Sequence, residues 1–368
     1  MRVALVHDWL NQNGGAERVL EALHALYPGA PVYTSLYAAE RLPEAYRSWD
    51  IRTSFMQWLP LAKRRHQPFL PLYPLAFQGF DLSAFDVVIS NSSAFCHCVP
   101  VAPGTLHINY CLTPPRFLWN LEHYLSRERV PGPVRALIPA LAKRLRDWDA
   151  RVAPQRVSEF VAISRAVQER IQRVYGRESA IIYPPVETSD FTPGAAVEDY
   201  YLVASRLIPY KRVDLAVRAF TQLGLPLVVV GTGRDQAALQ AIAGPSVRFE
   251  GWVSQDRLKA LLAGCRGFIF PGEEDFGIAP VEAQASGRPV VAYAAGGALE
   301  TVTEGVTGVF FHEPTADALA GAVRRAEATG WDRAAIRRHA EGYDTEVFKR
   351  AFTGFVEEQW ARRRGGGA

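Results

Sequence analysis

Carboxylates and a phosphate-binding geometry meet in residues 271–291, PGEEDFGIAPVEAQASGRPVV. Short apolar runs on both sides indicate strands, and a helix is expected to start near Phe276. A helix start presents unpaired N–H groups and a positive dipole end, so amides around Gly277 and Ile278 suit a phosphate. Glu274 and Glu282 repel phosphate but accept hydrogen bonds from hydroxyl groups. A ligand that carries both phosphates and sugar hydroxyls would use both features.

Two cations occupy another strand-to-helix turn, in the stretch ASRLIPYKRVDLAVRAF. Arg206 offers a planar fork and Lys211 a point charge, and such a pair can hold a diphosphate. Ordinary surface charge is the alternative interpretation. A third turn, GGAERVLEAL, lets a ligand approach the backbone at Gly14 and Gly15 before a helix begins. An ordinary strand-to-helix turn explains that pattern equally well.

Other patterns that could carry chemistry are weaker. Cys96, His97 and Cys98 are too tightly spaced, without a second ligand pair, to indicate zinc, and small half-buried residues at a strand end are expected. Asp147 and Asp149 lie two apart among arginines on an expected helix, where they face different directions, so a solvated helix face is predicted. We therefore expect no metal site.

A glycine pair after one strand, VVVGTGRDQ, resembles a dinucleotide-binding fingerprint in part. The third glycine is replaced by Gln236, and no ribose-binding acid follows at the required distance. A nicotinamide enzyme is therefore not favoured, and we expect no cofactor.

Composition limits the class of protein. The chain has 368 residues, of which 48% are hydrophobic, and this length suggests two domains with separate cores. The net charge of +3 gives no reason to expect a nucleic-acid partner. The four cysteines do not form a disulfide framework, and no apolar run reaches the length of a signal peptide or membrane span. A reducing, cytoplasmic setting is therefore expected.

The alternation of strands and helices occurs twice along the chain. Strand-like runs such as RVALVHDW, FDVVISNS and LHINYCL precede a polar stretch at 186–199, and YYLVASRL, LPLVVVG and RPVVAY follow it. This alternation predicts an α/β protein with two Rossmann-like, doubly wound domains and a ligand site at the carboxyl ends of the strands. We place the domains at 1–190 and 195–345, with the helix at 346–362 completing the first.

Several of these motifs, in this order, resemble those of the family 4 retaining glycosyltransferases. The Glu274–Glu282 pair resembles that family's paired-glutamate motif, GGAERVLEAL its acceptor-side loop and SRLIPYKRVDLAV its diphosphate-binding turn. The similarity extends along nearly the whole chain and implies the GT-B fold, in which two Rossmann-like domains face a central cleft. The stretches YCLTPPRF and AIIYPPVE resemble the bacterial O-antigen and exopolysaccharide branch, which often uses GDP-mannose and polyprenyl-diphosphate-linked acceptors.

The resemblance assigns roles to individual residues. Glu274 would contact the donor sugar, Glu282 the ribose, and Arg206 and Lys211 the diphosphate. Gly251 to Val253 would lie near the base. The catalytic residues would be Glu274, Arg206 and Lys211. The whole predicted binding set is Gly15, Arg206, Lys211, Val253, Glu274, Phe276, Gly277, Ile278, Ala279 and Glu282. Arg206, Lys211 and the helix amides would stabilise the departing diphosphate without a metal ion.

The implied function is a hexosyltransferase that moves a sugar from a nucleotide sugar, with GDP-mannose favoured, to a glycan or lipid-linked acceptor in surface polysaccharide or glycolipid synthesis. One residue departs from the family pattern, because Leu112 stands before TPPR where relatives usually carry histidine. His107 lies on the opposite face of the same expected strand and is a poor substitute. A nucleotide-sugar epimerase and a non-catalytic nucleotide-sugar-binding partner subunit remain alternatives.

The stretch LPLAKRRHQPFLPLYPLAF mixes basic with aromatic residues, and VRALIPALAKRLRDWDARV has a basic amphipathic pattern. Lys63, Arg64 and Arg65 lie in the first stretch. Surfaces of this kind bind anionic lipid interfaces, so peripheral contact with the inner face of the cell membrane is expected. A solvated helix face over an ordinary core is the alternative.

Overall fold

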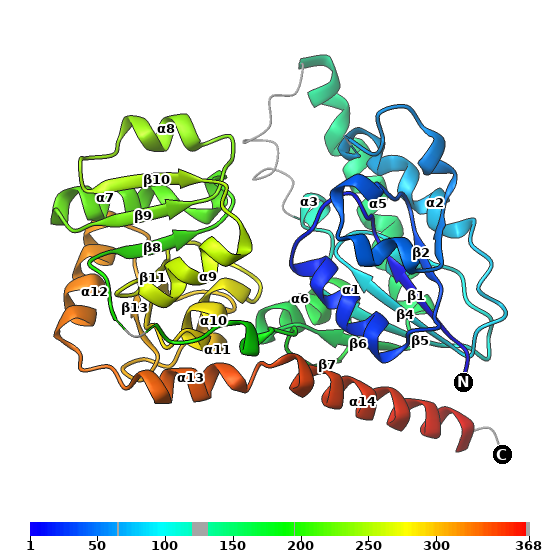
Figure 1. The fold of residues 1–368 in the computed structure, drawn as a ribbon. Helices are drawn as coiled ribbons and strands as arrows, with labels where there is room; N and C mark the ends of the chain where they lie inside the picture. Colours follow the sequence, from blue (N-terminus) through cyan, green and yellow to red (C-terminus); the bar gives the residue numbers. More distant parts are fainter. Residues whose placement is uncertain (65, 120–131, 195, 366–368) are drawn as a thin grey trace. The chain divides into compact units, whose positions relative to one another are not determined.

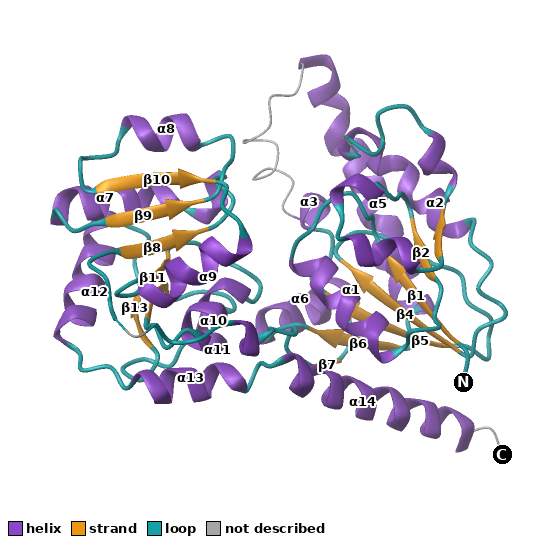
Figure 2. Cartoon of the chain, in the orientation of Figure 1, coloured by secondary structure: helices purple, strands orange, loops and turns teal. Residues whose placement is uncertain are grey.

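The computed structural model describes all of the chain except residues 65, 120–131, 195 and 366–368. The described residues divide into two compact units, one made of residues 1–183 and 348–368 and the other of residues 184–347 (Figure 1). Each unit contains one parallel sheet with helices on its faces (Figure 2). The predicted α/β, doubly wound fold class is therefore confirmed.

The first unit has the sheet order β3-β2-β1-β4-β5-β6-β7, with every strand pair parallel. Its strands are β1 Val3–His7, β2 Val32–Thr34, β3 Ile51–Thr53, β4 Val87–Ser92, β5 Leu106–Cys111, β6 Glu159–Ala162 and β7 Ser179–Ile181. Its helices are α1 Gly15–Leu26, α2 Tyr73–Gln78, α3 Arg116–Trp119, α5 Gly132–Arg156 and α6 Arg165–Tyr175, with short 3₁₀ turns η1 Ala39–Arg41, η2 Glu44–Ser48, η3 Phe55–Trp58, η4 Gln67–Leu72 and η5 Cys96–Cys98.

The second unit has the sheet order β10-β9-β8-β11-β12-β13, also parallel. Its strands are β8 Tyr201–Ala204, β9 Leu227–Val230, β10 Val247–Gly251, β11 Phe268–Phe270, β12 Val290–Tyr293 and β13 Gly308–Phe311. Its helices are α7 Val213–Leu223, α8 Gln236–Ala241, α9 Gln255–Gly264, α10 Ile278–Ala285, α11 Ala298–Thr301, α12 Ala316–Ala328 and α13 Arg333–Glu341, with 3₁₀ turns η6 Thr188–Asp190 and η7 Pro209–Lys211.

Each sheet grows outward in both directions from its first strand. In the second unit, β8 lies between β9 and β11, so the chain changes direction across the sheet at the β8–β11 pair. Ligands of open α/β sheets bind at such a switch point, at the carboxyl ends of the strands. The loop after β8 and the loop after β11 are therefore the positions where a ligand of this unit is expected.

A buried apolar core fixes the sheet of the second unit. Val203, Val229, Ile269 and Val291 come from four neighbouring strands and are all nearly inaccessible to solvent. They pack with Leu215, Ala216, Val217, Ala219 and Phe220 of α7 and with Leu319, Ala320, Ala322 and Val323 of α12. Both helices thus cover one face of this sheet, and α9 and α10 lie on the other (Figure 2). Because the core holds the strands, the loops at their ends have fixed starting points.

The polarity of the segment 186–199 predicts a linker, but its first residues, from Val186 to Phe191, are held within the second unit. Phe191 is buried there, the Val186 amide donates to the Tyr343 carbonyl at 3.0 Å, and the Thr188 hydroxyl bonds to Asp344. Polar composition did not reveal this packing, because the segment is held partly by hydrogen bonds of its backbone.

The last helix, α14 Thr345–Gly365, contributes to the first unit from Phe348 onward. Phe348 and Phe352 pack edge-on against Tyr110 of β5, with ring centroids 5.6 and 5.9 Å apart. Burial of these aromatic rings attaches the C-terminal helix to the first unit.

Candidate functional site

Glu274 and Lys211 form an ion pair at the switch point of the second unit. Glu274 lies in the loop after β11, and Lys211 ends the η7 turn between β8 and α7. The Lys211 ammonium contacts the Glu274 carboxylate, and the two side chains keep only 13% and 22% of their exposure. Two of the three predicted catalytic residues are therefore in direct contact.

Arg206, the third predicted catalytic residue, joins this group through Tyr210. Arg206 is exposed in the loop after β8, and its Nη2 lies 3.4 Å from the Tyr210 hydroxyl. The Lys211 ammonium lies 5.2 Å from the centroid of the Tyr210 ring. No sequence motif marks Tyr210, and its position next to Lys211 was the only available signal.

The helix start expected near Phe276 lies two residues later. Gly277 caps α10 in the left-handed conformation at φ +90°, which favours glycine, and the helix proper begins at Ile278. No side chain caps the first turn. The amides of Ile278 and Ala279, the first of the helix, therefore offer the N–H donors that a phosphate site requires. Glu282 consequently lies in the second turn of α10.

The remaining members of the predicted set differ in their surroundings. Phe276 and Glu282 are buried, at 3% and 5% exposure. Val253 lies in the loop after β10, at the same edge of the sheet as the Glu274 loop. Gly15 begins α1 in the first unit, after the cap residue Gly14. Within the second unit, the structure thus gathers Arg206, Lys211 and Glu274.

Neighbouring loops support the Glu274 loop and the Arg206 loop through the backbone. The amide of Gly297, in the loop after β12, donates to the Glu274 carbonyl at 2.8 Å. The Leu207 amide donates to the Thr232 carbonyl at 3.0 Å, which ties the Arg206 loop to the glycine-containing loop after β9. The stretch that resembled part of a dinucleotide fingerprint therefore supports the loop that carries Arg206.

Asp149 contradicts the prediction of a solvated helix face. Asp147 is exposed and pairs with Lys143, as expected, but Asp149 is completely buried. Its carboxylate lies 2.8 Å from His97 Nε2 and accepts a hydrogen bond from the Tyr175 hydroxyl at 2.9 Å. The arginine-rich sequence hid this contact because Asp149 faces the η5 turn rather than solvent.

His97, Cys98 and Asp149 each offer one ligand atom, and these atoms lie within 4.8 Å of one another. The contacts present are those of a hydrogen-bond network, because Ser92 Oγ also lies 2.9 Å from His97 Nδ1. The pKa of the Cys98 thiol is raised well above its ordinary value, mainly by burial and next by the negative charge of the nearby Asp149. Since metals bind the thiolate, this environment favours the network that holds α5 to η5.

His107, the nearest histidine to the position of Leu112, is already engaged. It is fully buried in β5, 2.9 Å from Ser90 Oγ through Nε2 and 3.0 Å from the Arg156 carbonyl through Nδ1. Burial lowers its pKa to about 3. His107 therefore cannot supply the side chain that Leu112 lacks.

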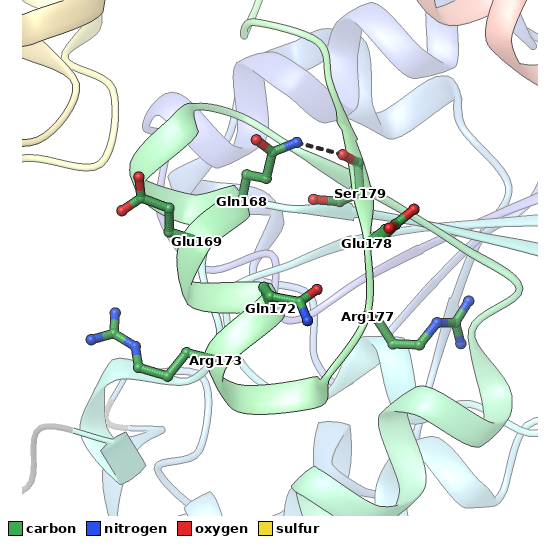
Figure 3. A pocket seen from close by; sticks show the side chains of 7 residues that line it. All are labelled: Gln168, Glu169, Gln172, Arg173, Arg177, Glu178 and Ser179. Carbon is green, nitrogen blue, oxygen red and sulfur yellow. Dashed lines mark hydrogen bonds between the residues drawn. The ribbon is translucent and has the colours of Figure 1, made fainter.

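An open hollow of about 570 Å³ lies elsewhere, in the first unit. Figure 3 shows that side chains of α6 and of the segment leading into β7 line it, and that Gln168 donates to the Ser179 carbonyl at 2.6 Å. Arg177 at its rim donates to carbonyls at the end of α5, including Val157 at 3.0 Å. This hollow contains none of the predicted site residues, so we do not assign the donor to it.

Known proteins resemble this chain in both sequence and fold. A "D-inositol 3-phosphate glycosyltransferase" of Mycobacterium avium is 32% identical over 51% of this chain and 52% of its own length. A "GDP-mannose-dependent alpha-(1-6)-phosphatidylinositol monomannoside mannosyltransferase" of Mycolicibacterium smegmatis is 30% identical over 49% of this chain and 59% of its own length. The chain thus spans between about half and three fifths of these two curated relatives.

Solved structures share the whole architecture. HepE of Anabaena, solved in complex with UDP, has a TM-score of 0.73 at 18% identity and covers 97% of this chain and 100% of its own. Sucrose-phosphate synthase from Thermosynechococcus elongatus has a TM-score of 0.72 at 17% identity, with 98% and 100% covered. At these identities the likeness shows the fold, and the predicted GT-B fold is confirmed.

One family matches the second unit, which contains Glu274, Lys211 and Arg206. The match covers residues 189–342 and ends just before α14. Residues 189–342 match the family described as glycosyl transferases group 1.

Proposed function

We propose that this chain is a retaining glycosyltransferase that moves a hexose from a nucleoside diphosphate sugar to a glycan or lipid-linked acceptor. The observation that carries the proposal is the meeting of Arg206, Lys211 and Glu274 at the switch point of the second unit. Two cations suit a diphosphate, and a carboxylate suits the hydroxyls of the attached sugar.

The chemistry follows from where charge develops. As the bond between sugar and phosphate breaks, negative charge builds on the diphosphate, which Arg206, Lys211 and the first amides of α10 can stabilise. Retention would follow from attack on the face that the leaving group departs from, with a donor phosphate oxygen taking the acceptor proton. Because side chains and amides carry the leaving-group charge, we propose that no metal ion is needed.

GDP-mannose is the donor that we favour. One relative is described as GDP-mannose-dependent, and this supports guanine and mannose. HepE has been solved with UDP and with UDP-glucose, and this supports a nucleotide sugar as the donor. Gly15 and the open start of α1 in the first unit would serve the acceptor, which we propose to be a glycan or a polyprenyl-diphosphate-linked sugar in surface polysaccharide or glycolipid synthesis.

A panel of nucleotide sugars tests the proposal. The shift in melting temperature should be largest with GDP-mannose, and UDP-glucose, UDP-galactose and GDP should serve as comparisons. Radiolabelled sugar should then move to an acceptor lipid extract only with the intact donor. Turnover of the donor without any acceptor would favour the epimerase instead, and binding without turnover would favour a non-catalytic partner subunit.

Peripheral membrane contact is a second proposal, which rests on one surface of the first unit. None of the helices in the described residues has the length and apolarity that a membrane span requires. Trp58 is 85% exposed, and Phe55, Leu61 and Leu75 are also exposed. Arg64 is exposed close by in sequence, and Arg65 lies outside the described residues. Aromatic and basic residues together favour binding to an anionic lipid surface, here the inner face of the cell membrane.

Vesicle flotation tests this second proposal. The protein should float with anionic vesicles and less with neutral ones, and added salt should reduce the difference. Trp58→Ser should weaken flotation, whereas Trp252→Ser, which changes a similarly exposed tryptophan in the second unit, should not. Equal flotation with both vesicle types would leave the surface as an ordinary solvated face.

A further inference from the structure

Tyr210 is the side chain that connects the two cations of the candidate site. Its hydroxyl lies 3.4 Å from Arg206 Nη2, and its ring centroid lies 5.2 Å from Lys211 Nζ. The first distance is that of a weak hydrogen bond, and the second is within the range of a cation–π contact. One aromatic side chain therefore touches both groups that we assign to the diphosphate.

The backbone around Tyr210 is held on both sides. Pro209 begins η7, and Arg212 follows it in the left-handed conformation at φ +51° as the cap of α7. The loop after β11 packs against the other side, because a Cβ added to Gly272 would lie 2.8 Å from the carbonyl oxygens of both Tyr210 and Lys211. Only a residue without a side chain allows this approach, so the ring starts from a fixed position.

The contact with the ring differs from the contact with Glu274. Lys211 also pairs with the Glu274 carboxylate, which neutralises its charge and competes with an anionic ligand. An aromatic face attracts an ammonium group without cancelling its charge, so the ammonium can still meet a phosphate. A ring between two cations can also fix their separation, although the cations repel one another.

We propose that Tyr210 is a positioning residue of the diphosphate site, which sets the spacing of Arg206 and Lys211 before the donor binds. The inference rests on the proposed function, because it assumes that these two cations hold a diphosphate. It gives Tyr210 no contact with the reacting atoms. Its loss should therefore affect ligands with two phosphates more than ligands with one.

Calorimetric titration with GDP and with GMP tests the proposal on the intact chain, with UDP and UMP as a second pair of probes. Tyr210→Leu should weaken GDP binding by roughly fivefold to tenfold and GMP binding by less than about twofold. Tyr210→Phe keeps the ring beside Lys211 but loses the hydroxyl beside Arg206, so it should restore only part of the lost affinity. Trp331→Leu, which alters another half-buried aromatic residue of the same unit, should change the affinity for neither ligand.

Three results would overturn the inference in distinguishable ways. If Tyr210→Leu binds GDP as the wild type does, while Arg206→Ala and Lys211→Ala bind it weakly, Tyr210 has no positioning role. If Tyr210→Leu loses GDP and GMP affinity equally and melts at a lower temperature, its role is structural only. If Arg206→Ala and Lys211→Ala also bind GDP normally, the proposed function fails and the inference fails with it.

Discussion

The ion pair between Lys211 and Glu274 predicts that removing a catalytic residue will strengthen nucleotide binding. Glu274→Gln keeps the shape of the side chain but removes its charge, so Lys211 loses the partner with which a diphosphate must compete. Both partners of this contact are charged and largely shielded from water. Hydrogen bonds to charged groups contribute about 1.5–3 kcal/mol to stability. In the wild type, GDP must replace that contact at Lys211.

About half of this cost is returned when the released carboxylate is hydrated, so roughly 0.75–1.5 kcal/mol of it should oppose nucleotide binding. We therefore expect Glu274→Gln to bind GDP about threefold to tenfold more tightly than the wild type. Sugar transfer should fall by about 10²–10³, because the contact with the reacting sugar is lost. Calorimetric titration with GDP and a radiolabel transfer assay measure the two effects.

Glu273→Gln is the matched control, because it removes the same charge from the exposed neighbouring residue. An exposed charge is screened, so this variant should bind GDP within about twofold of the wild type. Weaker GDP binding by Glu274→Gln, or the same increase in both variants, would show that the ion pair does not compete with the diphosphate.

Three further predictions concern Glu282, two histidines and Asp149. Glu282→Ala should weaken GDP binding by about tenfold in calorimetry, since the ribose loses a partner. Burial lowers the pKa of His66 to about 4 and that of His107 to about 3. As the pH falls below about 6.5, these histidines are therefore protonated in the unfolded state but not in the folded state. Urea titrations should show the free energy of unfolding falling below this pH, by up to about 1.4 kcal/mol per pH unit for each histidine. Asp149→Ala should cost about 3 kcal/mol of unfolding free energy and exposed Asp147→Ala almost nothing, and similar losses would contradict the network.

Much of the fold could be predicted because long apolar strands alternate with amphipathic helices. The runs at β1, β4, β8 and β9 are each four residues or longer and completely or largely buried, which makes them easy to detect. By contrast, β3 and β7 have only three residues each, with intermediate or exposed side chains, and were not identified as strands. Short edge strands are specified by their neighbours rather than by their own composition.

The candidate site was predictable where one segment carries the signal and not where two segments meet. Glu274, Arg206 and Lys211 follow strands and precede helices, so their position at the sheet edge could be inferred from local pattern. The Lys211–Glu274 pair joins residues 63 positions apart, and the close approach at Gly272 depends on β11 lying beside β8. Local periodicity contains no information on such contacts, and the same limit explains the error at Asp149.

The turnover number of Arg206→Ala and of Lys211→Ala at saturating donor, measured in the presence of EDTA, tests the central claim most directly. The wild type should remain active in EDTA, because we propose that these side chains stabilise the leaving diphosphate in place of a metal ion. Each variant should lose about 10²–10³ in kcat, or about 3–4 kcal/mol of transition-state stabilisation, and Lys211→Arg should recover little of it. Variants within a few-fold of the wild type, or a wild type that is inactive without divalent ions, would contradict the account.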